Sequence, residues 1–257
     1  MGESDADIVG TSDDPLTEAR QLAEGGHGAG VPLRLLGGLA VRVLCPDFPP
    51  RLRRDQDIDF GCLSKGRKDV MAFLESAGCE PDRRFNSLNG DRQMYFTAPS
   101  GRPIDVMVDR LTMCHTLDFR PSFRRQPLTV DVVDLLLSKL QIVELNEKDA
   151  RDIFQMLSCM PIVGADGGTG IDSDRFGDVM ASDWGWWRTV TGNLDKLPAL
   201  LAERPGLLQP GMPYEPLEQA AWLRKHADAV SKGIKWRARA SVGDKVRWYE
   251  LPEEVAH

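Results

Sequence analysis

Leu35-Leu36-Gly37-Gly38-Leu39-Ala40 and, further on, Arg54-Asp55-Gln56-Asp57-Ile58-Asp59-Phe60 are the two stretches that decide the fold of this chain. In the first, a glycine pair stands where an apolar strand gives way to a helix. In the second, carboxylates alternate with apolar residues, as on a strand with one buried face. The two stretches predict a strand that leads into a helix, followed by a second strand that carries paired acids.

The paired acids and the glycines suit one chemistry. Asp57 and Asp59 lie two residues apart, so on a strand both carboxylates face the same side and can share one hard cation. Magnesium is usually held by one or two carboxylates together with substrate phosphates. Gly37 and Gly38 have no side chain to keep a phosphate away, and they offer N–H groups near a helix start, where anions are favoured. These residues predict a Mg²⁺ site beside a binding site for a triphosphate.

A third acid follows on a later strand. Residues 102–108 read as a strand that follows a turn at 99–101, and Asp105 stands between the apolar residues Ile104 and Val106. A carboxylate on an interior strand is costly to bury unless it is paired or binds a metal. With Asp57 and Asp59 it could complete a site in which metal ions activate an attacking hydroxyl and stabilise a leaving pyrophosphate. The three aspartates are therefore the candidate catalytic and metal-binding residues.

The order of these motifs resembles the DNA polymerase beta-like nucleotidyltransferase superfamily. Within it, the chain is most similar to the bacterial abortive-infection type nucleotidyltransferases, which include toxins of toxin–antitoxin pairs. The resemblance covers residues 30–160. It implies a Mg²⁺-dependent enzyme that transfers a nucleoside monophosphate from an NTP to an acceptor hydroxyl and releases pyrophosphate.

The resemblance also implies a role for two later helices. The family carries a helical lysine followed by a helix with the pattern Lys/Arg-Asp-x-x-Asp, and this sequence has Lys139 and then Lys148-Asp149-Ala150-Arg151-Asp152. By resemblance, Lys139 holds the triphosphate, and Asp149 and Asp152 orient that lysine or the nucleotide. The alternatives are that Lys139 extends to solvent along an apolar surface, and that the two acids only form ion pairs on their helix.

Several acceptors and partners are compatible with the resemblance. The 3′ end of tRNA is the first choice, with an antitoxin protein as a further partner. A small molecule of the aminoglycoside type or a protein hydroxyl are alternative acceptors, and a non-catalytic nucleotide-binding protein that retains the fold is the alternative from another class. The stretch 224–247 is basic, contains Trp236 and is followed directly by Trp248 and Tyr249, which suits RNA binding. The same residues also read as a terminal β-hairpin whose tryptophans cover the core.

Composition excludes other classes of protein. The hydrophobic stretches are far shorter than the ~20 residues of a spanning helix, and the acidic start is unlike a signal peptide, so a cytoplasmic protein without a membrane segment is expected. A net charge of −7 argues against a general nucleic-acid coat. The five cysteines stand singly, which indicates neither a zinc cluster nor a disulfide framework.

The pattern along the chain predicts an α+β protein in two lobes. Residues 1–11 are expected to be disordered. Residues 12–128 form an α/β nucleotidyltransferase lobe with a mixed β-sheet, and residues 129–257 form a mainly helical C-terminal lobe that ends in the β-hairpin. Helices are predicted at 131–144, 147–159, 175–202 in pieces, and 217–232.

Overall fold

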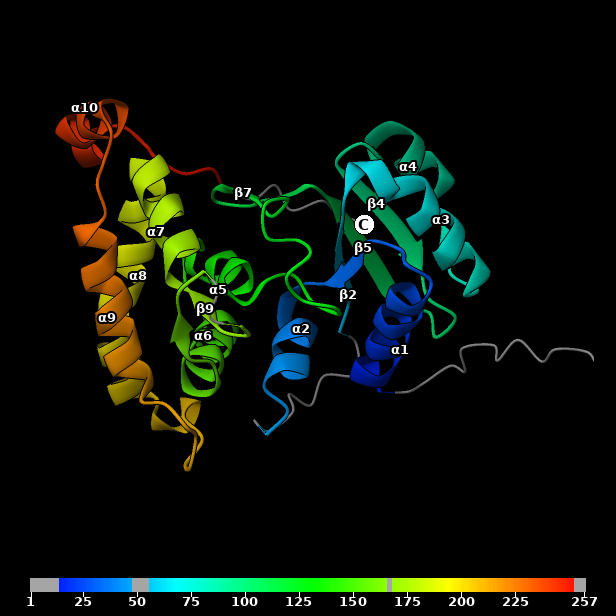
Figure 1. Ribbon diagram of the computed structural model, residues 1–257, viewed down its shortest axis with the longest axis horizontal. Helices are drawn as coiled ribbons and strands as arrows, with labels where there is room; N and C mark the ends of the chain where they lie inside the picture. The colour runs from blue at the N-terminus through cyan, green and yellow to red at the C-terminus, as the bar shows by residue number, and fades with distance from the viewer. Residues whose placement is uncertain (1–13, 48–55, 166–167, 252–257) are drawn as a thin grey trace, which may run out of the picture. The chain divides into compact units, whose positions relative to one another are not determined.

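The computed structural model describes residues 14–47, 56–165 and 168–251, and the chain divides into two compact units (Figure 1). The first unit comprises Met1–Val43, Pro50–Leu111 and Asp118–Asp131, and the second comprises Leu44–Pro49, Thr112–Leu117 and Val132–His257. The main boundary between the units lies after Asp131, whereas the sequence predicted a boundary after residue 128. The predicted disorder of residues 1–11 lies outside the described residues.

The first unit is built on a mixed five-stranded sheet, as predicted. Its strands run in the order β1 (Leu33–Leu35), β2 (Ile58–Cys62), β5 (Pro103–Val108), β4 (Gln93–Thr97) and β3 (Glu80–Pro81). Strands β2 and β5 are parallel, and the other neighbours are antiparallel. The parallel pair lies at the centre of the sheet, so both of its strands are held on two sides.

The two faces of this sheet differ in burial. Ile58, Phe60, Ile104 and Val106 are completely buried, whereas the residues that alternate with them on β5 are half-buried. Helix α1 (Pro15–Gly28) covers the apolar face, because its Gly26 lies against the Leu33 side chain. The sheet therefore keeps one side available for polar groups, and the acids lie on that side.

A buried ion pair fastens helix α1 to the turn between β4 and β5. The Glu18 carboxylate accepts hydrogen bonds from the Ser100 hydroxyl at 2.6 Å and from the Arg102 guanidinium at 2.7 Å. Glu18 is only 1% exposed, so these partners offset the cost of burying its charge. The remaining elements of this unit are α2 (Gly37–Leu44), η1 (Ser64–Gly66), α3 (Arg67–Ser76) and α4 (Arg83–Asn89). A short hairpin of β6 (Arg110–Thr112) and β7 (Thr116–Asp118) follows the sheet.

The second unit is mainly helical, as predicted. Its helices are α5 (Val132–Leu140), α6 (Glu147–Cys159), α7 (Ser173–Ser182), α8 (Trp184–Glu203), α9 (Pro216–Ala229) and α10 (Ile234–Val242), with short 3₁₀ turns η2 (Pro205–Leu207) and η3 (Gly243–Lys245). Strands β8 (Ile162–Val163) and β9 (Ile171–Asp172) form a small parallel pair. Every residue of α5 is buried, and α5 packs against α6, α7 and α8, so it is the core helix of this unit.

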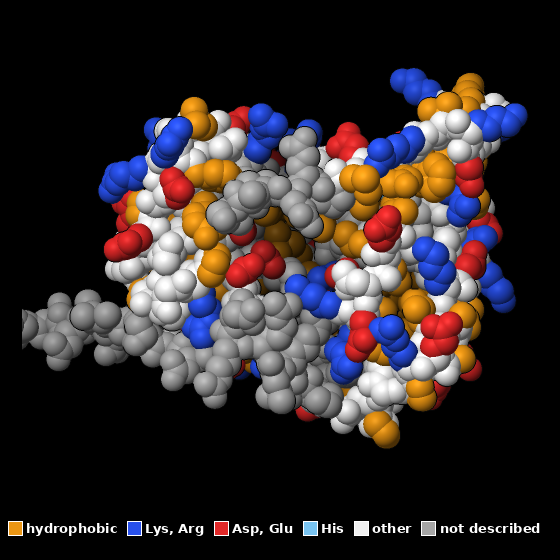
Figure 2. Space-filling view, turned by 180° about the vertical axis from the view of Figure 1, so that it is seen from behind, with side chains coloured by type: hydrophobic (Ala, Val, Ile, Leu, Met, Phe, Trp, Pro, Cys, Tyr) orange, Lys and Arg blue, Asp and Glu red, His pale blue; other side chains and the backbone are white. Residues whose placement is uncertain are grey.

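The predicted terminal β-hairpin is wrong. The alternation of basic and apolar residues from Lys235 to Ala240 suggested a strand, but these residues lie in helix α10. Arginine, lysine and alanine are good helix formers, and Gly243, with φ +60°, ends the helix. No residue of α10 is buried, so no sheet face was available to select the extended form. Figure 2 shows Lys and Arg side chains on α10 with exposed apolar ones between them.

Two other expectations concern the cysteines and the membrane. The cysteines are free, and four of them are buried. Burial raises the pKa of the Cys62 thiol to about 12 and that of Cys79 to about 11, so these thiols are unreactive packing groups. Among the helices that the structure describes, none combines the length and the apolar character needed to cross a membrane.

Candidate active site

Two of the predicted acids lie opposite each other on the central strands. Asp59 on β2 and Asp105 on β5 are partners in the parallel register. Both are half-buried, while their chain neighbours Ile58 and Ile104 are fully buried on the other face. Partner residues on adjacent strands point to the same side of a sheet, so the two carboxylates stand next to each other on its polar face.

The third predicted acid lies at the start of the same region. Asp57 immediately precedes β2 and is exposed. The pKa of Tyr95 on β4 is raised, first by partial burial of the phenol and then by the nearby charges of Asp105 and Asp57. Within the described parts of the chain, no three His, Cys, Asp or Glu side chains are grouped tightly enough to hold a metal ion. The site therefore consists of an adjacent pair, Asp59 and Asp105, with Asp57 beside it.

Gly37 brings the start of helix α2 against this acid pair. Gly37 has φ +65°, a conformation that favours glycine. A Cβ atom at this position would lie 2.2 Å from Oδ2 of Asp59, and the Leu36 N–H donates to the Asp59 carbonyl oxygen at 2.8 Å. The Asp59 carboxylate thus lies beside the first turn of α2, at the end of the helix where N–H groups favour negative charge.

Replacing Gly37 with alanine tests whether this contact matters. Both the positive φ and the clash with Asp59 oppose the new methyl group, so we expect a loss of roughly 2–5 kcal/mol in the free energy of unfolding, measured by urea denaturation. Gly30 is a matched control, because it has φ +71° but a Cβ atom there would meet nothing within 4 Å. Gly30→Ala should therefore lose only about 1–2 kcal/mol. Equal losses for the two variants would show that Asp59 does not restrict position 37.

Two residues of β4 that the sequence analysis did not select complete the surroundings of Asp105. The Gln93 amide donates to Oδ1 of Asp105 at 2.5 Å, which fixes the orientation of the carboxylate. Tyr95 is the register partner of Asp105 on the same face. Their signal in the sequence is the alternation of residues 93–97 beside the Asp105 strand, which places polar side chains from both strands on one face.

Lys139, Asp149 and Asp152 come together in the second unit. The Lys139 ammonium on α5 lies 3.0 Å from Oδ2 of Asp152 and 3.3 Å from Oδ1 of Asp149, both on α6. Asn146 caps α6 by accepting from the Asp149 N–H at 2.9 Å. Lys139 does not extend to solvent, since it is only 9% exposed. The expected link between the lysine and the two acids is present as a buried cluster of three charges.

The charge of this cluster limits what the lysine can do. Burial by itself lowers the pKa of Lys139, but the carboxylates of Asp152 and Asp149 outweigh it, so the pKa is raised and the ammonium stays charged. Two carboxylates and one ammonium give the cluster a formal charge of −1. As arranged here, the lysine is already neutralised by its own neighbours, and its role toward a triphosphate stays a prediction.

Comparisons with known proteins add little to this geometry. No family model matches the chain, and a search of curated proteins found no match. A solved structure described as a "putative nucleotidyltransferase from H. pylori" is similar over 84% of this chain and 95% of that chain, with 12% identity and a TM-score of 0.27. A similarity of this size identifies neither the fold nor the activity of the chain, so the function is inferred from the site.

Proposed function

We propose that the chain is a nucleotidyltransferase, which transfers a nucleoside monophosphate from an NTP to an acceptor hydroxyl and releases pyrophosphate. The observation that carries the proposal is the adjacent pair Asp59 and Asp105 on the polar face of the sheet, with Gly37 and the start of α2 against it. An acid pair beside a bare helix N-terminus offers sites for a cation and for the phosphates that the cation binds.

The donor set fits Mg²⁺. Two carboxylates on neighbouring strands supply the hard oxygen ligands that this ion prefers, and substrate phosphate oxygens and water complete its coordination in such sites. Asp59 and Asp105 would hold the ion, and Asp57 would lie beside them at the edge of the site. When bound, Mg²⁺ would polarise the phosphoryl group and neutralise charge that develops in the transition state.

The residues of the chain would mainly position the reactants, because phosphoryl transfer depends on alignment and charge stabilisation. The first turn of α2 at Gly37 and Gly38 would bind the triphosphate through its N–H groups. Asp105, oriented by Gln93 at 2.5 Å, would accept the proton of the acceptor hydroxyl. For Lys139, Asp149 and Asp152 the resemblance implies a role in binding the triphosphate, and we propose that role for them.

For the acceptor we propose the 3′ end of tRNA, as in the toxin branch of the family that the sequence resembles, with an antitoxin protein as regulator. A small-molecule or protein hydroxyl is the alternative acceptor. The support for this acceptor is the resemblance to the toxin branch.

In the experiment, purified protein is incubated with Mg²⁺ and each α-³²P-labelled NTP, together with total RNA or with an aminoglycoside, and the label is followed by gel electrophoresis and thin-layer chromatography. Label on tRNA supports the proposal with its first acceptor. Label on the protein or on an added aminoglycoside supports nucleotidyl transfer with a different acceptor. Binding of NTP without transfer to any acceptor would instead support a nucleotide-binding protein that lacks the chemistry.

A further inference from the structure

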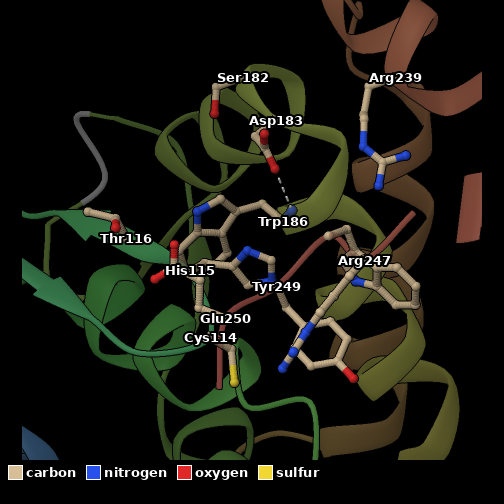
Figure 3. Close-up of a pocket in the computed structure, with 11 residues that line it drawn as sticks. Cys114, His115, Thr116, Ser182, Asp183, Trp186, Arg239, Arg247, Tyr249 and Glu250 are labelled. Carbon is tan, nitrogen blue, oxygen red and sulfur yellow. Dashed lines mark hydrogen bonds between the residues drawn. The ribbon is translucent and has the colours of Figure 1, made fainter. Parts of the chain in front are cut away.

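The second unit contains a pocket that the proposed function does not use. It has a volume of about 590 Å³, within the roughly 300–1,000 Å³ of small-molecule sites. Residues from three separate parts of the chain line it: residues 114–116, three residues at the junction of α7 and α8, and residues of α10 and of the segment that follows it. Figure 3 shows the rings of His115 and Trp186 side by side, with the Arg247 side chain near the Tyr249 ring and the Arg239 side chain extending from α10.

The aromatic residues of the pocket are held in place by hydrogen bonds. Thr189 accepts from the Trp248 indole N–H at 3.0 Å, and its hydroxyl lies 2.9 Å from Nε2 of His115. The imidazole lies against the Trp186 ring at 5.0 Å between centroids. The backbone N–H of Glu250 donates to the Cys114 carbonyl oxygen at 3.0 Å, which fastens the C-terminal segment to the pocket wall. A ligand would therefore meet preformed surfaces and would not have to order them.

Two arginines supply positive charge at this pocket. The Arg239 guanidinium donates to the carbonyl oxygens of Gly243 and Val246 at 2.9 and 2.7 Å and stacks on the Trp184 ring at 4.5 Å, so its orientation is fixed. Arg247 is exposed and stacks on Tyr249 at 4.8 Å. No carboxylate of the described residues forms an ion pair with either guanidinium. Guanidinium groups of this kind bind phosphate through paired N–H donors.

Acidic and neutral polar groups are also present. The carboxylates of Asp183 and Glu250 line the pocket, and Asp183 also caps α8 by accepting from the Trp186 N–H at 2.9 Å. Burial lowers the pKa of His115 to about 4, so its imidazole is neutral at physiological pH. Carboxylates beside cations disfavour a purely anionic ligand, but they accept hydrogen bonds from exocyclic amines and hydroxyl groups.

From these surfaces we infer that the second unit binds a nucleotide in this pocket, with its base stacked on the Tyr249 ring, its phosphate on Arg247 and Arg239, and its amine or ribose hydroxyls toward Asp183 and Glu250. A free mononucleotide and the terminal nucleotide of an RNA strand present the same chemistry. Stacked aromatic side chains with arginines are the usual means of binding single bases with their phosphates. The inference goes beyond nucleotidyl transfer and does not depend on it.

The test measures binding to the full-length Asp59→Asn protein in EDTA, so that Mg²⁺-dependent NTP binding does not contribute. The ligands are the four nucleoside monophosphates, ribose 5-phosphate and a short single-stranded RNA. Their binding is measured by equilibrium dialysis and by tryptophan fluorescence. We expect saturable binding with a Kd below about 1 mM for at least one nucleotide. Binding of the free nucleotide identifies it as the ligand, and binding of the RNA alone identifies a strand end.

Variants locate the site. Arg247→Glu should weaken binding by about tenfold or more, because it replaces a phosphate donor with a repelling charge. Tyr249→Ala should weaken binding by at least about fivefold through lost stacking, and Tyr249→Phe should retain it. Arg237→Glu is the matched control, because Arg237 is an exposed arginine of α10 that does not line the pocket.

Three results would overturn the inference. One is the absence of saturable binding below about 1 mM. Another is equal affinity for ribose 5-phosphate and the nucleotides, which would exclude a base site. The third is an Arg247→Glu variant that binds like the Arg237→Glu control. None of these results bears on transfer activity, so this inference and the proposed function can fail separately.

Discussion

Asp59→Asn is expected to lower the rate of nucleotidyl transfer by roughly 1,000-fold or more, since losing a ligand of the catalytic cation removes several kcal/mol of transition-state stabilisation and about 1.4 kcal/mol corresponds to a factor of ten. The amide has the same shape as the carboxylate but lacks its charge. The asparagine side chain would still fit beside Gly37, because glycine has no Cβ atom. A Cβ atom at position 37 would lie 2.2 Å from the side-chain oxygen of residue 59. The fold should therefore survive while the chemistry is lost.

The measurement is the initial rate of label transfer at saturating Mg²⁺, together with the thermal unfolding midpoint of each variant. Asp105→Asn should show a loss of similar size, because Asp105 is the register partner of Asp59. Asp91→Asn is the control, since its side chain is 69% exposed, and it should retain full activity. An Asp59→Asn variant that folds and transfers at more than about a tenth of the wild-type rate would refute the metal assignment.

The position of Asp57 differs from the one that the sequence predicted. The sequence predicted that Asp57 and Asp59 act as an equal pair, but Asp57 is exposed and precedes β2, whereas Asp59 stands directly beside Asp105. Alternation along one strand could predict which face a carboxylate occupies. It could not predict which residue of the neighbouring strand would stand opposite, because register depends on contacts between segments far apart in the sequence.

The glycine pair was predicted more fully than the acids around it. A bare turn between an apolar strand and a helix is a local feature, and Gly37 adopts the positive φ that such a turn requires. Local sequence patterns could not predict that the Asp59 carboxylate lies against this glycine. The contact joins α2 to β2, and only the packed sheet brings these two elements together.

The helical unit shows where local patterns succeed and where they fail. The period of the apolar residues in 147–159 predicted helix α6 with the bounds that the structure has, because its N-cap Asn146 and its buried stripe are encoded locally. For α10, alternation suggested a strand, but no partner face exists among the described residues and helix propensity decides. The pocket of the second unit had only a partial signal in the sequence: the basic stretch 224–247 suggested RNA binding, but the other segments that line the pocket are distant in the sequence.

Lys139→Ala is expected to lower the free energy of unfolding by about 3–5 kcal/mol, because it leaves two buried carboxylates without their cation. Asp152 is 2% exposed and Asp149 is 9% exposed, so water cannot replace the ammonium group, which lies 3.0 and 3.3 Å from their oxygens. Urea denaturation measures the loss. Lys225→Ala, an exposed lysine of α9, is the control and should stay within about 0.5 kcal/mol of wild type.

The triple variant K139M/D149N/D152N separates a structural role of the cluster from a role in nucleotide binding. Removing all three charges at nearly constant volume should recover most of the stability lost in Lys139→Ala, because neutral replacements of buried ion clusters are often as stable as the original. If the stable triple variant transfers label with an unchanged KM for NTP, the cluster only joins α5 to α6. If it folds but shows a KM raised about tenfold or more, then Lys139 contributes to triphosphate binding despite its two carboxylate neighbours, as the resemblance implies.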